Sequence, residues 1–169
     1  MQLEIVKKDI INWITNFVIV NNEKLDNWPP CPFARKTYID QKFDIRLGKD
    51  IIIDCHDCAV SWSDTYDVII YAYDRSAYST EQVAVAISDL NKKFNKSNLL
   101  LLDDHPDDIE IVNDVSFNQG TYILILIQRL DKVQTASAEL QKLGYYKLWP
   151  KHYYDKVAGW REQYGFDDN

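Results

Sequence analysis

The sequence predicts an α+β fold: a ferredoxin-like split βαβ core of about residues 67–149, with an added N-terminal helix and β-hairpin. Two observations predict the core. Strand, helix, strand, strand, helix and a last strand follow one another along this stretch. Each helix has one apolar face, as helices that cover a sheet do. The length of 169 residues suits one hydrophobic core, so we expect residues 1–66 and 67–169 to form a single domain.

The N-terminal third predicts a helix, a loop and a hairpin. Apolar residues recur three and four positions apart between Leu3 and Val20, which predicts a helix there. Three prolines within residues 27–36 predict a stiff loop that carries Cys31. Residues 37–47 alternate loosely in polarity, and Ile51–Asp54 follows a Gly48-Lys49 turn, so we expect the two strands of a hairpin.

The first half of the predicted core contains a strand, a helix and a second strand. Asp67–Tyr73 is rich in branched and aromatic residues, which favour strands. Ser79 and Gln82 have the spacing of a capping box, which indicates a helix that runs to about Asn95. Asn98–Leu102 then predicts a short buried strand.

The second half of the core predicts a central strand and two more elements. Thr121–Leu130 is the most apolar strand candidate, so we place it in the middle of the sheet. Asp131–Leu143 predicts a helix that ends at Gly144. Tyr145–Trp149 predicts the last strand, and His152–Tyr164 predicts a final helix rich in rings.

Composition and charge exclude several classes of protein. The formal net charge of −7 disfavours binding to the phosphates of a nucleic acid. The apolar runs fall short of the roughly 18 residues that a membrane helix needs, so we expect no membrane association. The N-terminus lacks a signal-peptide pattern, and three cysteines do not make a disulfide framework. We therefore expect a cytoplasmic protein.

The cysteines are the main candidates for chemistry. Cys55 and Cys58 form a C-x-x-C pair after an apolar run, and Cys31 could supply a third sulfur. His56 or His105 could complete the ligands of a zinc ion, and three thiolates would also suit an iron–sulfur cluster. Reactive thiols without a metal are a second interpretation. The alternative is that all three cysteines are buried and serve only as small apolar side chains.

A short motif surrounds the first of these cysteines. Cys31-Pro32-Phe33-Ala34-Arg35 follows the first predicted helix through a short loop. In this order the segment resembles the start of a family of small uncharacterised bacterial proteins that carry a C-P-F-A-[KR] motif after their first helix. The resemblance implies that Cys31 has a role beyond filling space.

Two charged segments are weaker candidates. Asp103–Asp114 is rich in carboxylates, which could hold Mg²⁺ or Ca²⁺, although a solvated loop is the favoured interpretation. The C-terminal segment is basic and aromatic, and its alternative role is a final helix that packs its rings on the sheet. As a docking surface for a partner it would use the following residues: Trp149, Lys151, His152, Tyr153, Lys156 and Trp160.

Two functions follow from these candidates. The first is a small cytosolic protein in which Cys31, Cys55 and Cys58 bind a metal or act as reactive thiols on a small molecule. The second is a non-catalytic module whose C-terminal segment binds another protein. The sequence contains no phosphate-binding loop and no hydrolase signature, so it does not decide whether the protein is an enzyme.

Overall fold

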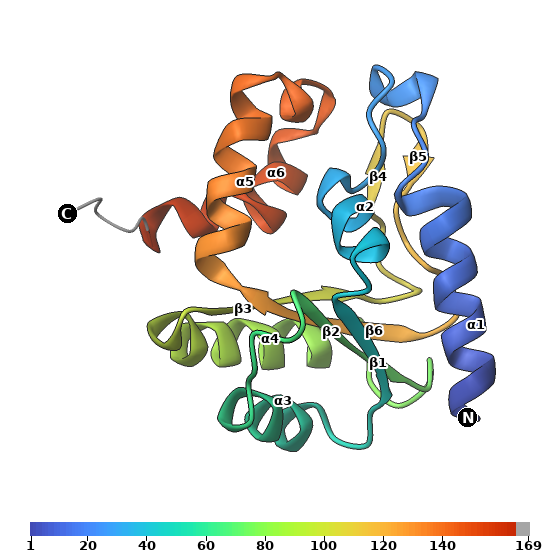
Figure 1. Cartoon of the computed structure of the whole chain (residues 1–169), viewed down its shortest axis with the longest axis vertical. Helices are drawn as coiled ribbons and strands as arrows, with labels where there is room; N and C mark the ends of the chain where they lie inside the picture. The colour runs from blue at the N-terminus through green and yellow to red at the C-terminus, as the bar shows by residue number, and fades with distance from the viewer. Residues whose placement is uncertain (165–169) are drawn as a thin grey trace.

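A four-stranded mixed sheet organises the chain in a computed structural model, which describes residues 1–164 (Figure 1). The strands lie in the order β1-β2-β6-β3. β1 and β2 are parallel, whereas β6 runs antiparallel to both β2 and β3. The strands of the sheet are β1 (Phe43–Leu47), β2 (Val68–Tyr73), β3 (Leu99–Asp104) and β6 (Ile123–Arg129). A separate two-stranded hairpin consists of β4 (Ile111–Val112) and β5 (Val115–Ser116).

Helices cover both faces of the sheet (Figure 1). One face, here called the α1 side, carries α1 (Leu3–Trp13), α2 (Pro32–Ile39), α5 (Leu130–Lys142) and α6 (Lys151–Val157). The other, the α4 side, carries α3 (Ile51–Val60) and α4 (Thr80–Phe94). Shorter helical turns are Ile14–Val18, Glu23–Leu25, Asn95–Ser97, Tyr145–Leu148 and Gly159–Tyr164. Within residues 1–164, every helix is too short or too polar to cross a membrane.

Alternation along β2 divides the interior into two cores. Ile69, Tyr71 and Tyr73 face the α4 side, where they pack with residues of α3 and α4. Ile70 and Ala72 face the α1 side, where they pack against α1. This is the period of two that a strand imposes on its side chains. Both faces are apolar, so each needs its own layer of helices.

The predicted α+β class is confirmed, but the ferredoxin-like core is not. Strand β2, helix α4, strands β3 and β6 and helix α5 follow in the predicted order, and β6 is central. However, the place beside β2 is occupied by β1, which runs parallel to it. The predicted last strand at 145–149 is a 3₁₀ turn instead. Gly144 turns the chain with a φ of 84°, and the Tyr145 hydroxyl donates to the Pro30 carbonyl at 2.5 Å.

The predicted N-terminal hairpin is wrong, although part of its first strand forms as β1 at Phe43–Leu47. Residues 37–39 belong to α2, and Ile51–Asp54 begins α3. Asp50 caps α3, because its carboxylate accepts a hydrogen bond of 2.9 Å from the Ile53 N–H. Ile51, Cys55 and Cys58 are the buried residues of this helix, at the spacing of one helical face. The C-x-x-C pair of Cys55 and Cys58 therefore lies within a helix.

The C-P-F-A-R segment begins a helix and holds the end of another. Pro32 lies in the first turn of α2, where its missing N–H costs nothing. The Cys31 N–H donates to the Val18 carbonyl at 3.0 Å, and the Arg35 guanidinium donates to the Ile19 carbonyl at 2.7 Å. These bonds satisfy carbonyls that the end of the first helix leaves open. That helix is confirmed in outline, with a π-helical turn at Ile14–Val18 after α1.

Candidate functional site

A cavity of about 490 Å³ lies on the α1 side of the sheet. Leu102 of β3 and Leu126 of β6 line it, and they are direct neighbours across the strand pair. Both lie on the face opposite the α4-side residues Leu101 and Ile127. Along the outer edge of β3 the cavity also extends to the α4 side, where it is lined by Leu101 and by Ala84, Ile87, Ser88, Asn91 and Lys92 of α4.

Rings and aliphatic side chains from distant parts of the chain form the walls. Trp13 and Val18 come from the end of the first helix, and Cys31 comes from the loop before α2. Phe117 follows β5, and Trp160 follows α6. Mostly apolar walls with a few polar groups are typical of small-molecule sites.

One wall residue has an unused hydrogen-bond donor. The indole Nε1 of Trp13 is buried and has no acceptor among the residues that the structure describes. A buried N–H without an acceptor is destabilising by about 1–3 kcal/mol. A ligand with an acceptor oxygen or nitrogen near Trp13 would remove this cost.

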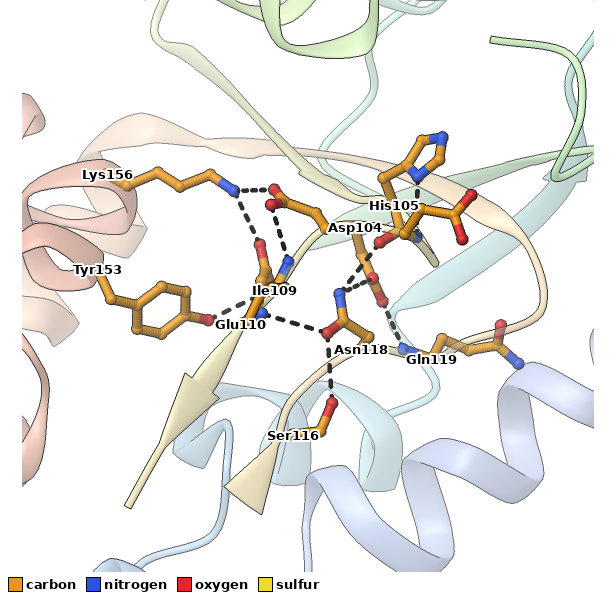
Figure 2. A network of polar contacts seen from close by, with 11 residues as sticks. Asp104, His105, Ile109, Glu110, Ser116, Asn118, Gln119, Tyr153 and Lys156 are labelled. Atoms are coloured by element: carbon orange, nitrogen blue, oxygen red, sulfur yellow. Dashed lines mark hydrogen bonds and ion pairs between the residues drawn. The ribbon is translucent and has the colours of Figure 1, made fainter. Parts of the chain in front are cut away.

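The polar end of the cavity is organised by Asp104 at the end of β3. Its carboxylate accepts hydrogen bonds from the Gln119 N–H at 2.8 Å and the Asn118 side-chain amide at 3.1 Å. The same amide nitrogen also donates to the His105 carbonyl at 3.1 Å (Figure 2). These bonds fix the loop after the β4–β5 hairpin against the end of β3.

Glu110 lies at the centre of a second group of contacts in the same network. Lys156 of α6 donates to Glu110 at 3.2 Å and also binds Asp108, and the Tyr153 hydroxyl donates to Glu110 at 3.4 Å (Figure 2). Burial raises the pKa of Glu110 to about 7, although the Lys156 ammonium opposes the shift. Glu110 can therefore hold or release a proton near neutral pH, which is the property of a general acid or base.

Carboxyl groups dominate the electrostatics of this end. Burial also raises the pKa of Asp103 and of Asp104, and both line the cavity with Glu110. Lys156 has a raised pKa, because hydrogen bonding to Asp108 and the charges of Glu110 and Asp103 outweigh its burial. Positive charge from a ligand would lower the cost of ionising these buried carboxyl groups.

The structure does not bring the three cysteines together. Cys55 and Cys58 are buried on the α4 side beside Tyr71 and Tyr73. Cys31 packs against the core of the α1 side, across the sheet from the other two. Residues 1–164 contain no group of three or more His, Cys, Asp or Glu side chains that could hold a metal ion.

The two candidate histidine ligands also lie apart. His105 is 2% exposed, and both of its ring nitrogens are within 3.0 Å of a main-chain partner, the Asp107 N–H and the Tyr78 carbonyl. Nδ1 accepts from Asp107, so Nε2 carries the proton and donates to Tyr78. His56 lies on α3, where its ring meets Phe94 edge-on.

The predicted partner-binding segment turns most of its rings inward. Trp149 stacks on Tyr153, which is buried, and both rings contact Phe117. The remaining four residues have different surroundings: Trp160 lines the cavity, Lys156 binds Asp108 and Glu110, Lys151 binds Asp155, and His152 is exposed. Most rings of this segment therefore form walls and core, and its exposed residues are Lys151, His152 and Lys156.

Sequence reasoning missed Trp13, and it placed Asp104 and Glu110 in a segment that could hold Mg²⁺ or Ca²⁺ but was favoured to be a solvated loop. The acidic segment 103–114 was expected to be a solvated loop, yet Asp104, His105 and Glu110 are buried. A usable signal was present, since Leu100, Leu102 and Asp104 alternate along one strand and therefore share a face. Glu110 also directly precedes the apolar pair Ile111-Val112, which indicates a strand rather than a loop.

Comparison with models of known protein families, with curated proteins and with solved structures found no match.

Proposed function

We propose that the protein binds a small organic molecule in the cavity on the α1 side, and that this ligand combines an apolar, ring-sized body with an amine. The cavity of about 490 Å³ carries the proposal, because its apolar walls end in a cluster of carboxyl groups. Pockets of this size with a few convergent polar groups are the usual sites of small ligands.

The charges at the polar end support an amine over an acid. Asp103, Asp104 and Glu110 all line the cavity, and so does Lys156, which donates a hydrogen bond to Glu110. An ammonium group beside Glu110 would favour the carboxylate form, whereas an anionic ligand would meet three acids. Trp13 adds a donor for an acceptor atom elsewhere on the ligand.

Dansylcadaverine is a suitable probe, because it joins an apolar ring system to a primary amine. Energy transfer from the tryptophans of the wall to the dansyl group reports binding directly. We expect dansylcadaverine to bind at least about tenfold more tightly than dansylglycine, which carries a carboxylate instead. We expect Glu110→Gln to remove most of this preference, since the variant loses a charge and keeps the shape.

Two tryptophan substitutions test whether the cavity is the binding site. Leu126→Trp fills the cavity from the sheet and should abolish binding of both probes, with the fold checked by circular dichroism. Val85→Trp is the matched control, because Val85 is exposed on the outer surface of α4. Unchanged binding in a folded Leu126→Trp variant, or tighter binding of dansylglycine, would contradict the proposal.

A further inference from the structure

The cavity runs along the outer edge of β3. Residues 101–104, four in a row on this strand, all line it. Neighbouring residues of a strand point to opposite faces, so a cavity that touches four in a row passes along the edge and reaches the main chain. β3 lies at one end of the sheet, and no other strand within residues 1–164 pairs with its outer edge.

The main-chain groups of β3 point alternately toward the sheet and toward the cavity. The N–H and C=O of Leu101 bind the side-chain amide of Asn91, so they point outward, away from β6. In an antiparallel pair, residues two apart direct their main-chain groups the same way. The N–H and C=O of Asp103 therefore also point outward. The edge offers two pairing positions, and Asn91 already occupies the one at Leu101.

Asp103 is the open position on this edge. Among residues 1–164, its N–H faces only the carboxylate of its own side chain, and its carbonyl accepts no hydrogen bond. Unpaired main-chain groups on an edge strand are a template for another extended chain. A peptide that lies beside the edge can exchange two hydrogen bonds with one such residue.

The two ends of the edge set the direction of such a peptide. Asp104 and Glu110 line the cavity where β3 ends, which is the place proposed above for an ammonium group. Asn91 closes the edge at Leu101. A peptide with its N-terminal ammonium at the acidic end therefore runs back toward Leu101, antiparallel to β3.

We propose that the ligand is the amino terminus of a short peptide with a large apolar first side chain, held as an added strand against Asp103. This inference rests on the proposed amine site and adds the ligand's main chain to it. The first residue lies opposite Asp104, with its ammonium beside Glu110. Its side chain shares the face of Asp104 and enters the apolar part of the cavity, at Leu102 and Leu126. The second residue lies opposite Asp103 and exchanges two hydrogen bonds with it.

Asn91 limits the length of peptide that the edge can hold. In this register a third residue lies opposite Leu102, and a fourth lies opposite Leu101. The N–H and C=O of Leu101 are already bound by Asn91, both at 2.9 Å. A fourth residue therefore gains no main-chain hydrogen bond, and we expect the site to be specific for the first two or three residues.

The tripeptide amide Phe-Gly-Gly tests the proposal on the full-length protein by isothermal titration calorimetry. We expect it to bind at least about tenfold more tightly than phenethylamine, which has the same ring and amine but no peptide group. Leu126→Trp should abolish binding of the tripeptide, and Val85→Trp should leave it unchanged. Equal affinities for the tripeptide and phenethylamine would overturn the proposal.

A methyl group on one of two peptide nitrogens tests the strand pairing. On the second residue it removes the hydrogen bond to the Asp103 carbonyl, so the Phe-Sar-Gly amide should bind at least about tenfold more weakly. On the third residue the nitrogen points away from β3, so the Phe-Gly-Sar amide, the matched control, should differ from the parent by less than about threefold. Equal losses from both methyl groups would overturn the pairing with Asp103.

Two further comparisons separate this inference from the proposed function. Acetylation of the amine should weaken the tripeptide at least about tenfold; an acetylated peptide that binds as tightly would refute the amine site and this inference with it. If dansylcadaverine binds and the two methylated peptides do not differ, the amine site stands and only this inference fails. A fourth glycine should change the affinity by less than about twofold, and a tenfold gain would refute the assigned direction.

Discussion

The side-chain amide of Asn91 binds the main chain of Leu101 twice. Its nitrogen donates to the Leu101 carbonyl, and its oxygen accepts from the Leu101 N–H, both at 2.9 Å. Leu101 lies on β3, an edge strand of the sheet, and Asn91 projects from α4. The amide thus occupies two main-chain groups that would otherwise be open to another strand, which is one way to protect a sheet edge.

Replacing Asn91 tests the strength of this contact. We expect Asn91→Ala to lower the free energy of unfolding by about 2 kcal/mol, because it leaves two buried main-chain groups of Leu101 without partners. Urea unfolding measures the change, and light scattering should show more self-association. The control is Asp89→Ala on the same helix, whose exposed ion pair with Lys92 should contribute less than about 0.5 kcal/mol. Equal losses in both variants would contradict the edge-protecting role.

Glu110 should make stability depend on pH. Its pKa rises from 4.5 in the unfolded chain to about 7 in the folded protein, because of burial. Between these values the unfolded state releases a proton that the folded state keeps, so stability falls as pH rises. The two pKa values correspond to roughly 3 kcal/mol in total. The full contribution of Glu110 to the free energy of unfolding is present below pH 4.5 and is lost by about pH 7.

The variant Glu110→Gln isolates this contribution. Relative to the wild type, its free energy of unfolding should rise by roughly 3 kcal/mol between pH 4.5 and 7, since only the wild type loses stability through this group. Other titrating groups cancel in the comparison. Exposed Glu139 provides the control: the free energy of unfolding of Glu139→Gln should change with pH in parallel with that of the wild type. A parallel curve for Glu110→Gln would mean that Glu110 ionises normally.

The buried thiols of α3 should stay protonated far above neutral pH. Burial raises the pKa of Cys55 to about 12 and that of Cys58 to about 11. In a Cys31→Ser variant, ultraviolet thiolate absorbance should therefore remain low while circular dichroism shows the folded protein. A bound zinc or iron ion would instead hold these residues as thiolates at neutral pH. Early thiolate absorbance would support the metal-binding prediction made from the C-x-x-C pair.

Gly48 should tolerate no side chain. A Cβ at this position would lie 2.1 Å from the ring of Tyr73, which is 1% exposed. The ring is also held by a hydrogen bond of 3.1 Å from its hydroxyl to Asp54. We expect Gly48→Ala to cost about 2 kcal/mol or more of unfolding free energy. In a Tyr73→Leu background the same change should cost much less, and an additive double-mutant cycle would refute the clash.

Local signals predicted the elements that tertiary contacts did not override. The capping box of Ser79 and Gln82 forms as expected and begins α4. The run Ile51-Ile52-Ile53 favours a strand locally, but the Asp50 cap and the apolar spacing of Ile51, Cys55 and Cys58 specify a helix. In this segment the spacing carried more information than the residue types.

The site was less predictable than the fold. Its wall and polar end come from segments far apart in the sequence, among them Trp13, Cys31, Phe117 and Lys156. No local pattern relates these residues, because a cavity forms only where separate elements pack. Cys31, Lys156 and Trp160 were singled out in advance, but for a thiol or metal site and for a docking surface; the C-x-x-C pair lies across the sheet.

The central position of β6 governs when the sheet can assemble. β2 and β3 do not pair with each other; both pair with β6, the last strand of the sheet in the sequence. During synthesis, the apolar strands β2 and β3 therefore emerge before the strand that joins them. Pairings between distant segments fold slowly and leave edges open to aggregation. Assembly of this sheet is thus a late, cooperative step, and a nascent chain that ends before Ile123 leaves β3 and one edge of β2 without the strand that pairs with them, apolar segments that a chaperone would have to shield.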